Sequence, residues 1–397
     1  MTDWPVAGFT STGSKRPEAL FGEDGSAAGF GLRMARARGC RVWDTEGREY
    51  VDYVMALGAV ALGYAHPEVT EAVRAAAEAG VVGPLAPALE AEVAGEIRRL
   101  MPWMERIRFL KTGAEACAAA VRLARVATGR DLVLGCGYHG WLDWCQATGR
   151  GTPAPVGALY GEVRFNDVEG TRRAIRRAGD RLACVMTEPV IEAEPAREWL
   201  ETLREETERV GALLVVDDVK TVCRIAVGGG VERYGIRADL AVLGKALANG
   251  FPLAAVGGRA DLMAGVDRTW ISSTLATEFV SLAAARATLA VMERERVPAR
   301  LAAVGGTLLE GLQELAARYP DRVSGAAGLP EMCFLRFSGE EVSRAVARRA
   351  AGRGVLFKRS AYNFVSLAHD EAAIRSTLAV LDEALAGVGP RPAPGRV

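Results

Sequence analysis

The sequence predicts an α/β protein with a mainly parallel central sheet in a large domain and a smaller α+β domain after it. Between residues 106 and 245, short continuous apolar runs alternate with helix-like segments, which is the pattern of parallel strands covered by helices on both faces. The chain has 397 residues, 50% of them hydrophobic, and so exceeds the usual size of one compact core. Together these observations indicate two domains and a buried parallel sheet.

The predicted elements follow the chain in a regular order. Two β-type runs around a Thr-Glu-Gly turn predict a hairpin at 41–53. Apolar runs predict strands at 106–111, 131–137, 182–189, 212–218 and 239–245, with weaker strands near 331–338. Amphipathic patterns predict helices at 112–130, 196–211, 278–297, 298–320, 340–352 and 371–387. We therefore expect an N-terminal segment with the hairpin at 1–60, which packs with the small domain, a large domain at 61–295, a small domain at 296–397 and a disordered tail at 389–397.

Composition narrows the classes of partner. Lysine plus arginine equals aspartate plus glutamate at 49 each, which favours a small molecule over nucleic acid or an anionic membrane. The seven cysteines are scattered without C-x-x-C spacing, which indicates neither a disulfide framework nor a zinc site. The N-terminus lacks the features of a signal peptide, and no apolar stretch approaches a membrane span. We expect a soluble, cytoplasmic protein without a metal.

Lys245 ends one of the apolar runs, in the stretch DLAVLGKALANGFPLAA. Lysine is scarce, since only five of the 49 basic residues are lysines. Arginine stays protonated, whereas a desolvated lysine amine can lose its proton and act as a nucleophile. A lysine that extends from a strand end to solvent is the plainer interpretation of this one residue. The neighbouring motifs decide between a nucleophilic lysine and a lysine that extends to solvent.

Two other strand ends carry groups suited to an anionic, aromatic ligand. Thr112, Gly113 and Ala114 lead into an alanine-rich helix whose free N–H groups form a site for a phosphate, although Thr112 also fits a plain helix cap. Asp217 ends another predicted strand, where a buried carboxylate can keep a pyridine nitrogen protonated. Val219 shares its side of the strand and can pack against the ring.

The segment GCGYHGW at 135–141 matches the G-x-G-x-x-G fingerprint of dinucleotide-binding proteins. We interpret the match as accidental, because no acidic residue follows at the distance that the fingerprint needs to hold a ribose. Tyr138, at this strand end, suits stacking on a planar ring. A nicotinamide-dependent oxidoreductase is the alternative that this motif favours.

Several segments, taken in order, resemble the signature of class III pyridoxal-phosphate aminotransferases, and the nearest likeness is to the glutamate-1-semialdehyde aminomutase group. They are RVWDTEGREYVDY, KTGAEACAAAVRLARVATGR, GYHGW, TEPV, VVDDV, DLAVLGKALANGFPLAA and STLATE. Asp217 and Lys245 are 28 positions apart, and the resemblance covers roughly residues 20–390. It implies the PLP-dependent transferase fold of type I, a cytoplasmic homodimer with shared active sites, and pyridoxal 5'-phosphate bound to Lys245 as a Schiff base.

The resemblance also implies a role for each site residue. Lys245 would be the base that moves a proton, and Asp217 would pair with the pyridinium nitrogen. His139 and Glu188 would support the site without chemistry of their own. The further residues that it places at the cofactor ring and phosphate are Thr112, Gly113, Ala114, Tyr138, Val219 and, from the neighbouring subunit, Thr274.

The chain departs from the family pattern at several positions. Asp218 stands where the family usually has glutamate, Ala114 stands where it has serine or threonine, and STLATEF keeps only the Thr-Leu of GTLSGNP. The aminomutase group grips the substrate carboxylate with an early Ser-Pro-Val-Arg segment, where this chain has GSKRPEAL. Lys15 or Arg16 would serve the same purpose or belong to a solvated basic patch. The segment VMALG at 54–58 also lacks the Ser-Trp pair of that group.

The expected function is therefore a class III aminotransferase that moves an amino group from a small-molecule donor to a ketone or aldehyde acceptor, in specialised metabolism. An aminomutase, in which one substrate passes through both half-reactions, is the nearest alternative. A lyase or epimerase on the same fold is another. A protein that binds the cofactor but catalyses no reaction is the last alternative.

Overall fold

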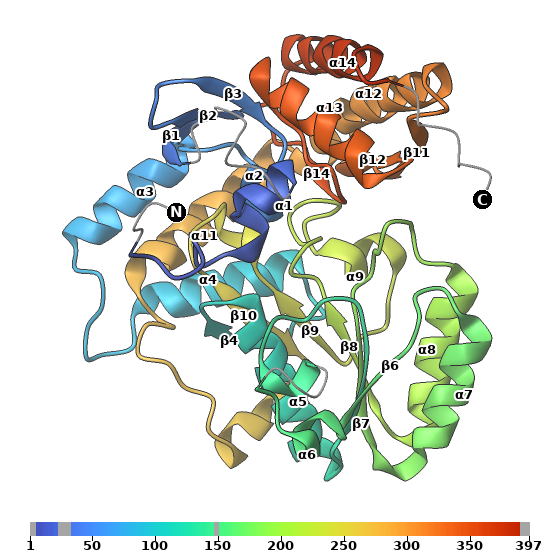
Figure 1. Ribbon diagram of the computed structural model, residues 1–397. Coiled ribbons are helices and arrows are strands. Elements are labelled where there is room, and N and C mark those ends of the chain that lie inside the picture. Colours follow the sequence, from blue (N-terminus) through green and yellow to red (C-terminus); the bar gives the residue numbers. More distant parts are fainter. Residues whose placement is uncertain (1–4, 23–32, 147–150, 390–397) are drawn as a thin grey trace. The chain divides into compact units, whose positions relative to one another are not determined.

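The computed structural model describes residues 5–22, 33–146 and 151–389. The chain divides into two compact units. Unit 1 is Met1–His66 together with Arg300–Val397, and unit 2 is Pro67–Ala299. Figure 1 shows the elements of both units. The domain boundaries expected after residues 60 and 295 stay a prediction, and the tail expected at 389–397 lies, beyond Gly389, outside the described residues.

Unit 2 is built on a seven-stranded sheet in the order β4-β10-β9-β8-β7-β5-β6. The sheet is mostly parallel, as expected, but β10 is antiparallel to both of its neighbours. The sequence did not predict β10 or the short strand β6. The strands are β4 Arg106–Leu110, β5 Leu132–Cys136, β6 Tyr160–Glu162, β7 Leu182–Thr187, β8 Leu213–Asp217, β9 Leu240–Leu243 and β10 Ala254–Gly258.

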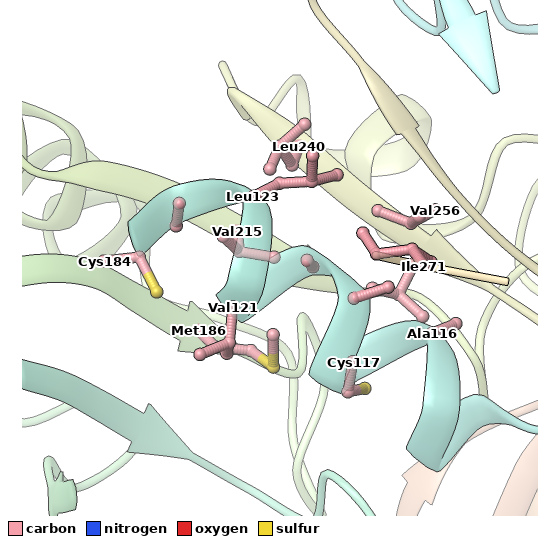
Figure 2. Packing of buried hydrophobic residues seen from close by; sticks show 14 of the residues in the cluster. Ala116, Cys117, Val121, Leu123, Cys184, Met186, Val215, Leu240, Val256 and Ile271 are labelled. Atoms are coloured by element: carbon pink, nitrogen blue, oxygen red, sulfur yellow. The ribbon is translucent and has the colours of Figure 1, made fainter. Parts of the chain in front are cut away.

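The central strands of this sheet are covered on both faces. Every residue of β7 and of β9 is buried, so neither face of these strands meets solvent. On one face lies the helix α5, Gly113–Thr128, whose buried positions are largely alanine. Figure 2 shows side chains of α5 packed against Met186 of β7 and Val215 of β8. Small side chains let α5 approach the sheet closely, which fixes where its first turn lies.

Among the remaining helices of unit 2, α8 and α11 match the helices predicted at 196–211 and 278–297, and the others were not predicted. In α8 the fully buried Trp199 donates a hydrogen bond from Nε1 to Thr171 Oγ1 of α7 at 3.0 Å, which ties the two helices together. The helices are α3 Pro67–Glu78, α4 Ala88–Leu100, α6 Ala154–Gly157, α7 Val168–Ala178, α8 Arg197–Val210, α9 Gly229–Tyr234, α10 Ala260–Met263 and α11 Phe279–Arg294.

Unit 1 contains two smaller sheets and the expected C-terminal helices. The hairpin predicted at 41–53 is confirmed as the antiparallel pair β2–β3. The sheets have the orders β1-β2-β3-β13 and β11-β12-β14. The strands are β1 Met34–Arg38, β2 Arg41–Asp44, β3 Glu49–Asp52, β11 Val323–Leu329, β12 Met332–Phe337, β13 Val355–Leu356 and β14 Asn363–Phe364. The helices are α1 Pro17–Phe21, α2 Met55–Gly58, α12 Val297–Arg318, α13 Glu340–Gly352 and α14 Glu371–Ala386. Among the described residues, no helix combines the length and the apolar character that a membrane span needs.

Candidate active site

Lys245 follows the buried strand β9 after a single glycine. Gly244 continues the extended backbone at φ −177°. Lys245 then adopts a left-handed conformation at φ 47°, at the start of the 3-10 turn Lys245–Ala248. This conformation is costly for a residue with a Cβ, by about 1 to 3 kcal/mol, and persists only where packing enforces it. The buried strand therefore holds the lysine backbone in one place.

The Lys245 amine has no ion pair in the described part of the chain. Lys111 and Lys220, the other lysines of unit 2, each have a carboxylate within 2.7 Å of Nζ. Burial lowers the pKa of Lys245, and the positive charge of Lys220 lowers it further. An amine that is unpaired and has a lowered pKa is the one suited to attack a carbonyl carbon.

Asp217 ends β8 as a buried carboxylate with three hydrogen-bond donors. Its Oδ2 accepts from His139 Nδ1 at 2.8 Å and from Cys117 Sγ at 3.3 Å. Its Oδ1 accepts from the Val219 N–H at 3.1 Å. Burial acts to raise the pKa of Asp217, but the donors, led by His139, outweigh it and hold the pKa below its usual value. Asp217 is therefore an ionised group inside the protein.

The two side chains that bind Asp217 Oδ2 come from different elements. His139 lies in the segment after β5 and is 3% exposed, and Cys117 lies near the start of α5 and is 1% exposed. From the sequence we expected His139 to support the site, but the contact of Cys117 with Asp217 was not predicted. Helical periodicity marks Cys117 as a buried position without showing which strand end it faces.

Cys117, His139 and Asp217 also form a cluster whose ligand atoms lie within 4.8 Å of one another, a spacing that a metal ion could use. Metal ions bind the thiolate of cysteine, not the thiol. Burial, together with the charge of Asp217, raises the pKa of the Cys117 thiol well above its usual value. The chemistry of this cluster therefore favours hydrogen bonds around Asp217 over a metal site.

Thr112 caps α5, as the sequence allowed. The Glu115 N–H donates to Thr112 Oγ1 at 3.2 Å, and the Thr112 N–H donates to Glu115 Oε2 at 2.9 Å, which completes a capping box. The next two residues are Gly113 and Ala114. Backbone N–H groups at the first positions of a helix have no carbonyl of their own helix to bind, and they attract anions. The backbone here offers donors to a phosphate.

Val219 follows the end of β8 and lies between the start of α5 and the residue after β9. A Cβ on Gly113 would lie 3.0 Å from each methyl carbon of Val219, and a Cβ on Gly244 would lie 3.4 Å from the nearer one. The Val219 side chain therefore packs against the start of α5 and against the residue before Lys245. The ends of β8 and β9 thus meet the helix start at the carboxyl edge of the sheet, where ligands bind in α/β proteins.

The glycines of GCGYHGW serve close packing. A Cβ on Gly140 would lie 2.5 Å from Ala114 Cβ, and a Cβ on Gly137 would lie 2.5 Å from Glu188 Oε2. Both glycines have positive φ, 106° and 114°, which residues with a Cβ rarely adopt. The element that follows is the 3-10 turn Asp143–Cys145 and not the helix that a dinucleotide fingerprint requires.

Tyr138 and Thr274 lie at the surface of unit 2. Tyr138 is 70% exposed, and its N–H donates to Glu188 Oε2 at 3.0 Å. Thr274 is exposed in the segment that leads to α11. Within the described chain, neither side chain is hydrogen bonded to Lys245 or Asp217. Of the sequence-predicted residues, Gly113, Asp217 and the residue before Lys245 contact Val219.

Asp218 makes buried hydrogen bonds that the sequence did not predict. Its side chain is fully buried against the start of α9. Its Oδ1 accepts hydrogen bonds from the Gly230 N–H at 2.5 Å and from the Thr221 hydroxyl at 2.6 Å. A Cβ on Gly229 would lie 2.3 Å from this oxygen. The aspartate side chain therefore occupies space that is free only because glycines stand at the start of α9. Burial raises the pKa of Asp218 to about 6.

The basic residues considered for a substrate carboxylate lie in unit 1. Lys15 ends the 3-10 turn Gly13–Lys15 and is exposed, as is Arg16. Lys15 lines a cavity of about 610 Å³ whose wall includes Trp43 and Tyr64.

Comparison with known proteins places the chain in a family. The model of the family Aminotransferase class-III matches residues 25–385. The chain belongs to the class III aminotransferase family. The glutamate-1-semialdehyde 2,1-aminomutase of Neisseria gonorrhoeae (strain NCCP11945) is 34% identical over an alignment of 409 positions, gaps included, which covers 94% of each chain.

Solved structures of this family share the fold over almost the full length. The FumI protein of Sphingopyxis sp. MTA144, in its PLP internal aldimine form, is 26% identical with a TM-score of 0.89, and the match covers 97% of this chain and 96% of that chain. The β-phenylalanine aminotransferase of Variovorax paradoxus is 27% identical with a TM-score of 0.84, covering 96% and 91%. The class III aminotransferase described here thus has fold type I and depends on pyridoxal phosphate.

The groups at the carboxyl edge of the sheet fit this cofactor. The unpaired Lys245 amine matches its aldehyde, and the ionised Asp217 matches a ring nitrogen that carries a proton. The first turn of α5 offers N–H donors to its phosphate. Gly113 and Gly140 allow this turn to pack closely against Val219 and against the segment after β5. Each part of the cofactor therefore has a chemical counterpart.

We expect the stability of the protein to depend on pH through Asp218. The folded pKa of about 6 lies above the ordinary value of 3.8, so this carboxyl contributes stability that is complete below pH 4 and is lost as the pH rises through 6. Relative to Asp218→Asn, the wild-type free energy of unfolding should fall by about 2 to 3 kcal/mol across this range. Denaturant titrations of both proteins at a series of pH values measure this difference, and a difference that does not change with pH would contradict the assignment.

Proposed function

We propose that this enzyme transfers an amino group from a small-molecule donor to a ketone or aldehyde acceptor, and that Lys245 is the residue that binds the cofactor. The observation that carries the proposal is the state of the Lys245 amine. It has no ion pair within the described residues, its pKa is lowered by burial, and its neighbour Gly244 packs on Val219 next to Asp217. When bound, pyridoxal phosphate supplies an electron sink for charge that develops on the substrate carbon.

Asp217 is proposed to hold the ring nitrogen of the cofactor in its protonated form. A buried carboxylate favours a positive charge beside it, because the interaction is stronger at low effective dielectric than in water. The hydrogen bonds from His139, Cys117 and Val219 support this role, since they keep Asp217 ionised in spite of its burial. An Asp217 that took up a proton would lose the role.

Lys245 is also proposed as the group that moves the proton. A base must release its proton readily after taking it up, and a lowered pKa makes an amine release its proton more readily. Lys245 Nζ would accept a proton from the carbon that carries the donor's amino group and return it later in the cycle. The positive charge of Lys220, which lowers the pKa of Lys245, supports this role.

Contacts with the rest of the cofactor are proposed for residues around the helix start. Val219 packs on one face of the ring, and the exposed Tyr138 side chain is available for the other. The N–H groups of Gly113 and Ala114 bind the phosphate, and Thr112 stabilises the helix that presents them. Because the Thr112 hydroxyl already bonds to Glu115, its share in phosphate binding is secondary.

We also propose a homodimer in which Thr274 reaches the phosphate in the neighbouring subunit. Two segments of unit 2 with exposed apolar side chains support this arrangement. The Phe279 N–H donates to the Val81 carbonyl at 2.8 Å, which joins the segment after α3 to the start of α11 and so to the segment that leads into it. The exposed apolar side chains of these two segments are Val81, Val82, Leu85, Trp270 and Leu275. Apolar surface of this kind is typical of subunit contacts.

An aminomutase is the second candidate. The likeness to a glutamate-1-semialdehyde 2,1-aminomutase over 94% of the chain favours it. Against it, the segment that would carry the carboxylate grip of that group reads GSKRPEAL. The solved structures of similar fold include proteins named aminotransferases. We therefore place transfer between two substrates first.

Replacement of Lys245 by alanine should abolish covalent attachment of the cofactor. Borohydride reduction of the wild-type holoenzyme is expected to leave one phosphopyridoxyl group per chain, on the peptide that contains Lys245, because no other amine of unit 2 is unpaired. Peptide mass spectrometry measures this, with Lys358→Ala as the control that keeps the adduct. An adduct at another lysine in the wild-type protein would overturn the assignment.

The exchange of Thr274 between subunits can be tested with hybrid dimers. Lys245→Ala and Thr274→Ala should each be impaired alone, the latter by about tenfold or more in cofactor affinity, as expected for a lost hydrogen bond to a charged group. In a hybrid of the two variants, one site would combine an intact Lys245 with an intact Thr274. Mixing and reassociating the variants should restore activity, measured against each variant alone, whereas no recovery would place Thr274 in its own subunit's site or outside both.

A single half-reaction separates the two candidate functions. With a panel of amines and amino acids as donors, an aminotransferase should release about one equivalent of carbonyl product per active site in the absence of an acceptor. The aminomutase alternative predicts no stoichiometric release, because its substrate stays in the site. Chromatographic assay of the carbonyl product, together with the visible spectrum of the cofactor, makes the measurement.

A further inference from the structure

The Cys117 thiol lies against the one carboxylate that the proposed function cannot do without. Its sulfur is 3.3 Å from Asp217 Oδ2, the same oxygen that receives His139 Nδ1 at 2.8 Å. Cys117 and Asp217 are 100 positions apart in the chain, and both are almost completely buried. The contact is therefore a product of the fold and is shielded from water.

The thiol can act only as a donor in this contact. An ionised carboxylate has acceptor sites alone, so the hydrogen between sulfur and oxygen must come from Cys117. Burial, with the charge of Asp217, raises the pKa of the thiol well above its usual value, which keeps the proton on sulfur. The donors on Asp217 are thus distributed unequally, with two side chains on Oδ2 and a single backbone N–H, from Val219, on Oδ1.

We propose that Cys117 is a positioning residue: its thiol and the His139 ring together hold Oδ2 of Asp217, so that Oδ1 keeps a free acceptor site for the ring nitrogen of the cofactor. This inference rests on the role of Asp217 in the proposed function. A carboxylate has about four acceptor sites, and three are used by the donors of this chain. With Cys117 the carboxylate is held by three donors, and this restricts its rotation about the Cβ–Cγ bond more than His139 and Val219 alone would.

A thiol suits this place better than a stronger donor. Sulfur is a weak donor, and the contact at 3.3 Å is longer than the one from His139. It fixes the orientation of the carboxylate while withdrawing little of its negative charge. The charge of Asp217 therefore stays available to the protonated ring nitrogen.

Cys184 provides a matched control for Cys117. It lies on β7, is fully buried in the same apolar cluster, and has no hydrogen-bond partner for its thiol among the described residues. Figure 2 shows both side chains in this cluster. Replacing either cysteine by alanine removes one buried sulfur, but only Cys117→Ala removes a donor from Asp217. A purely structural effect should therefore be equal in the two variants.

We expect Cys117→Ala to weaken the action of the cofactor and leave substrate binding unchanged. In the holoenzyme, kcat should fall about tenfold and the dissociation constant for pyridoxal phosphate should rise by a similar factor. The KM of the donor should stay within about twofold, because Asp217 acts on the cofactor and not on the substrate. Cys117→Ser, which restores a donor but one that withdraws more charge from Asp217, should recover part of the loss, and Cys184→Ala should resemble the wild type. Equal effects in Cys117→Ala and Cys184→Ala, or no recovery with serine, would overturn the proposal.

The thiol contact can also be observed without catalysis. A thiol that donates to a carboxylate has an S–H stretching band at lower frequency than a free thiol. Infrared difference spectra of wild type against Cys117→Ala, in the holoenzyme and after cofactor removal, should show such a shifted band, and those against Cys184→Ala should show an unshifted one. A shifted band in a protein that binds no pyridoxal phosphate would refute the proposed function and this role with it. An unshifted band in an active enzyme would refute the role of Cys117 alone.

Discussion

The structure of the candidate active site depends on keeping one negative charge inside the protein. An unpaired buried carboxylate would cost several kcal/mol of stability, or would take up a proton and become neutral. Asp217 avoids both outcomes because donors reach it from α5, from the segment after β5 and from its own strand end. The relative positions of these three elements therefore cannot change independently. The requirement of a buried charge is what links the packing of the large unit to its chemistry.

Small residues make this convergence sterically feasible. Gly140 lies against Ala114, and Gly113 lies against Val219, at distances that leave no room for an added Cβ. The same logic explains the alanine-rich face of α5, which lets the helix settle on the sheet (Figure 2). Two sequence features that look unrelated, a glycine motif and an alanine-rich helix, thus share one physical cause. A chain with bulkier residues at these positions would hold the helix start away from the strand ends.

The sequence was sufficient to predict the parallel strands and the positions of Lys245 and Asp217 at their ends, because continuous apolar runs mark buried strands and strand ends share one edge of a sheet. It did not predict β10, whose short run ends in two glycines. Nor did it reveal the contacts of Cys117 and Asp218, since periodicity shows that a side chain is buried but not what it faces. Those contacts depend on long-range packing that only the fold supplies.

The proposed cofactor residues and the residues considered for the substrate lie in different units, and this separation has an evolutionary consequence. All residues proposed to hold the cofactor lie between Thr112 and Thr274, in one unit, whereas Lys15 and the segment VMALG lie in the other. Mutations in the latter can accumulate while the cofactor machinery stays intact. If Lys15 or VMALG contacts the substrate, as considered above, an enzyme of this design would change its substrate through residues outside the unit that carries its chemistry. Because unit 1 is formed by both ends of the chain, exchange of that unit between relatives would need crossovers near residues 66 and 299.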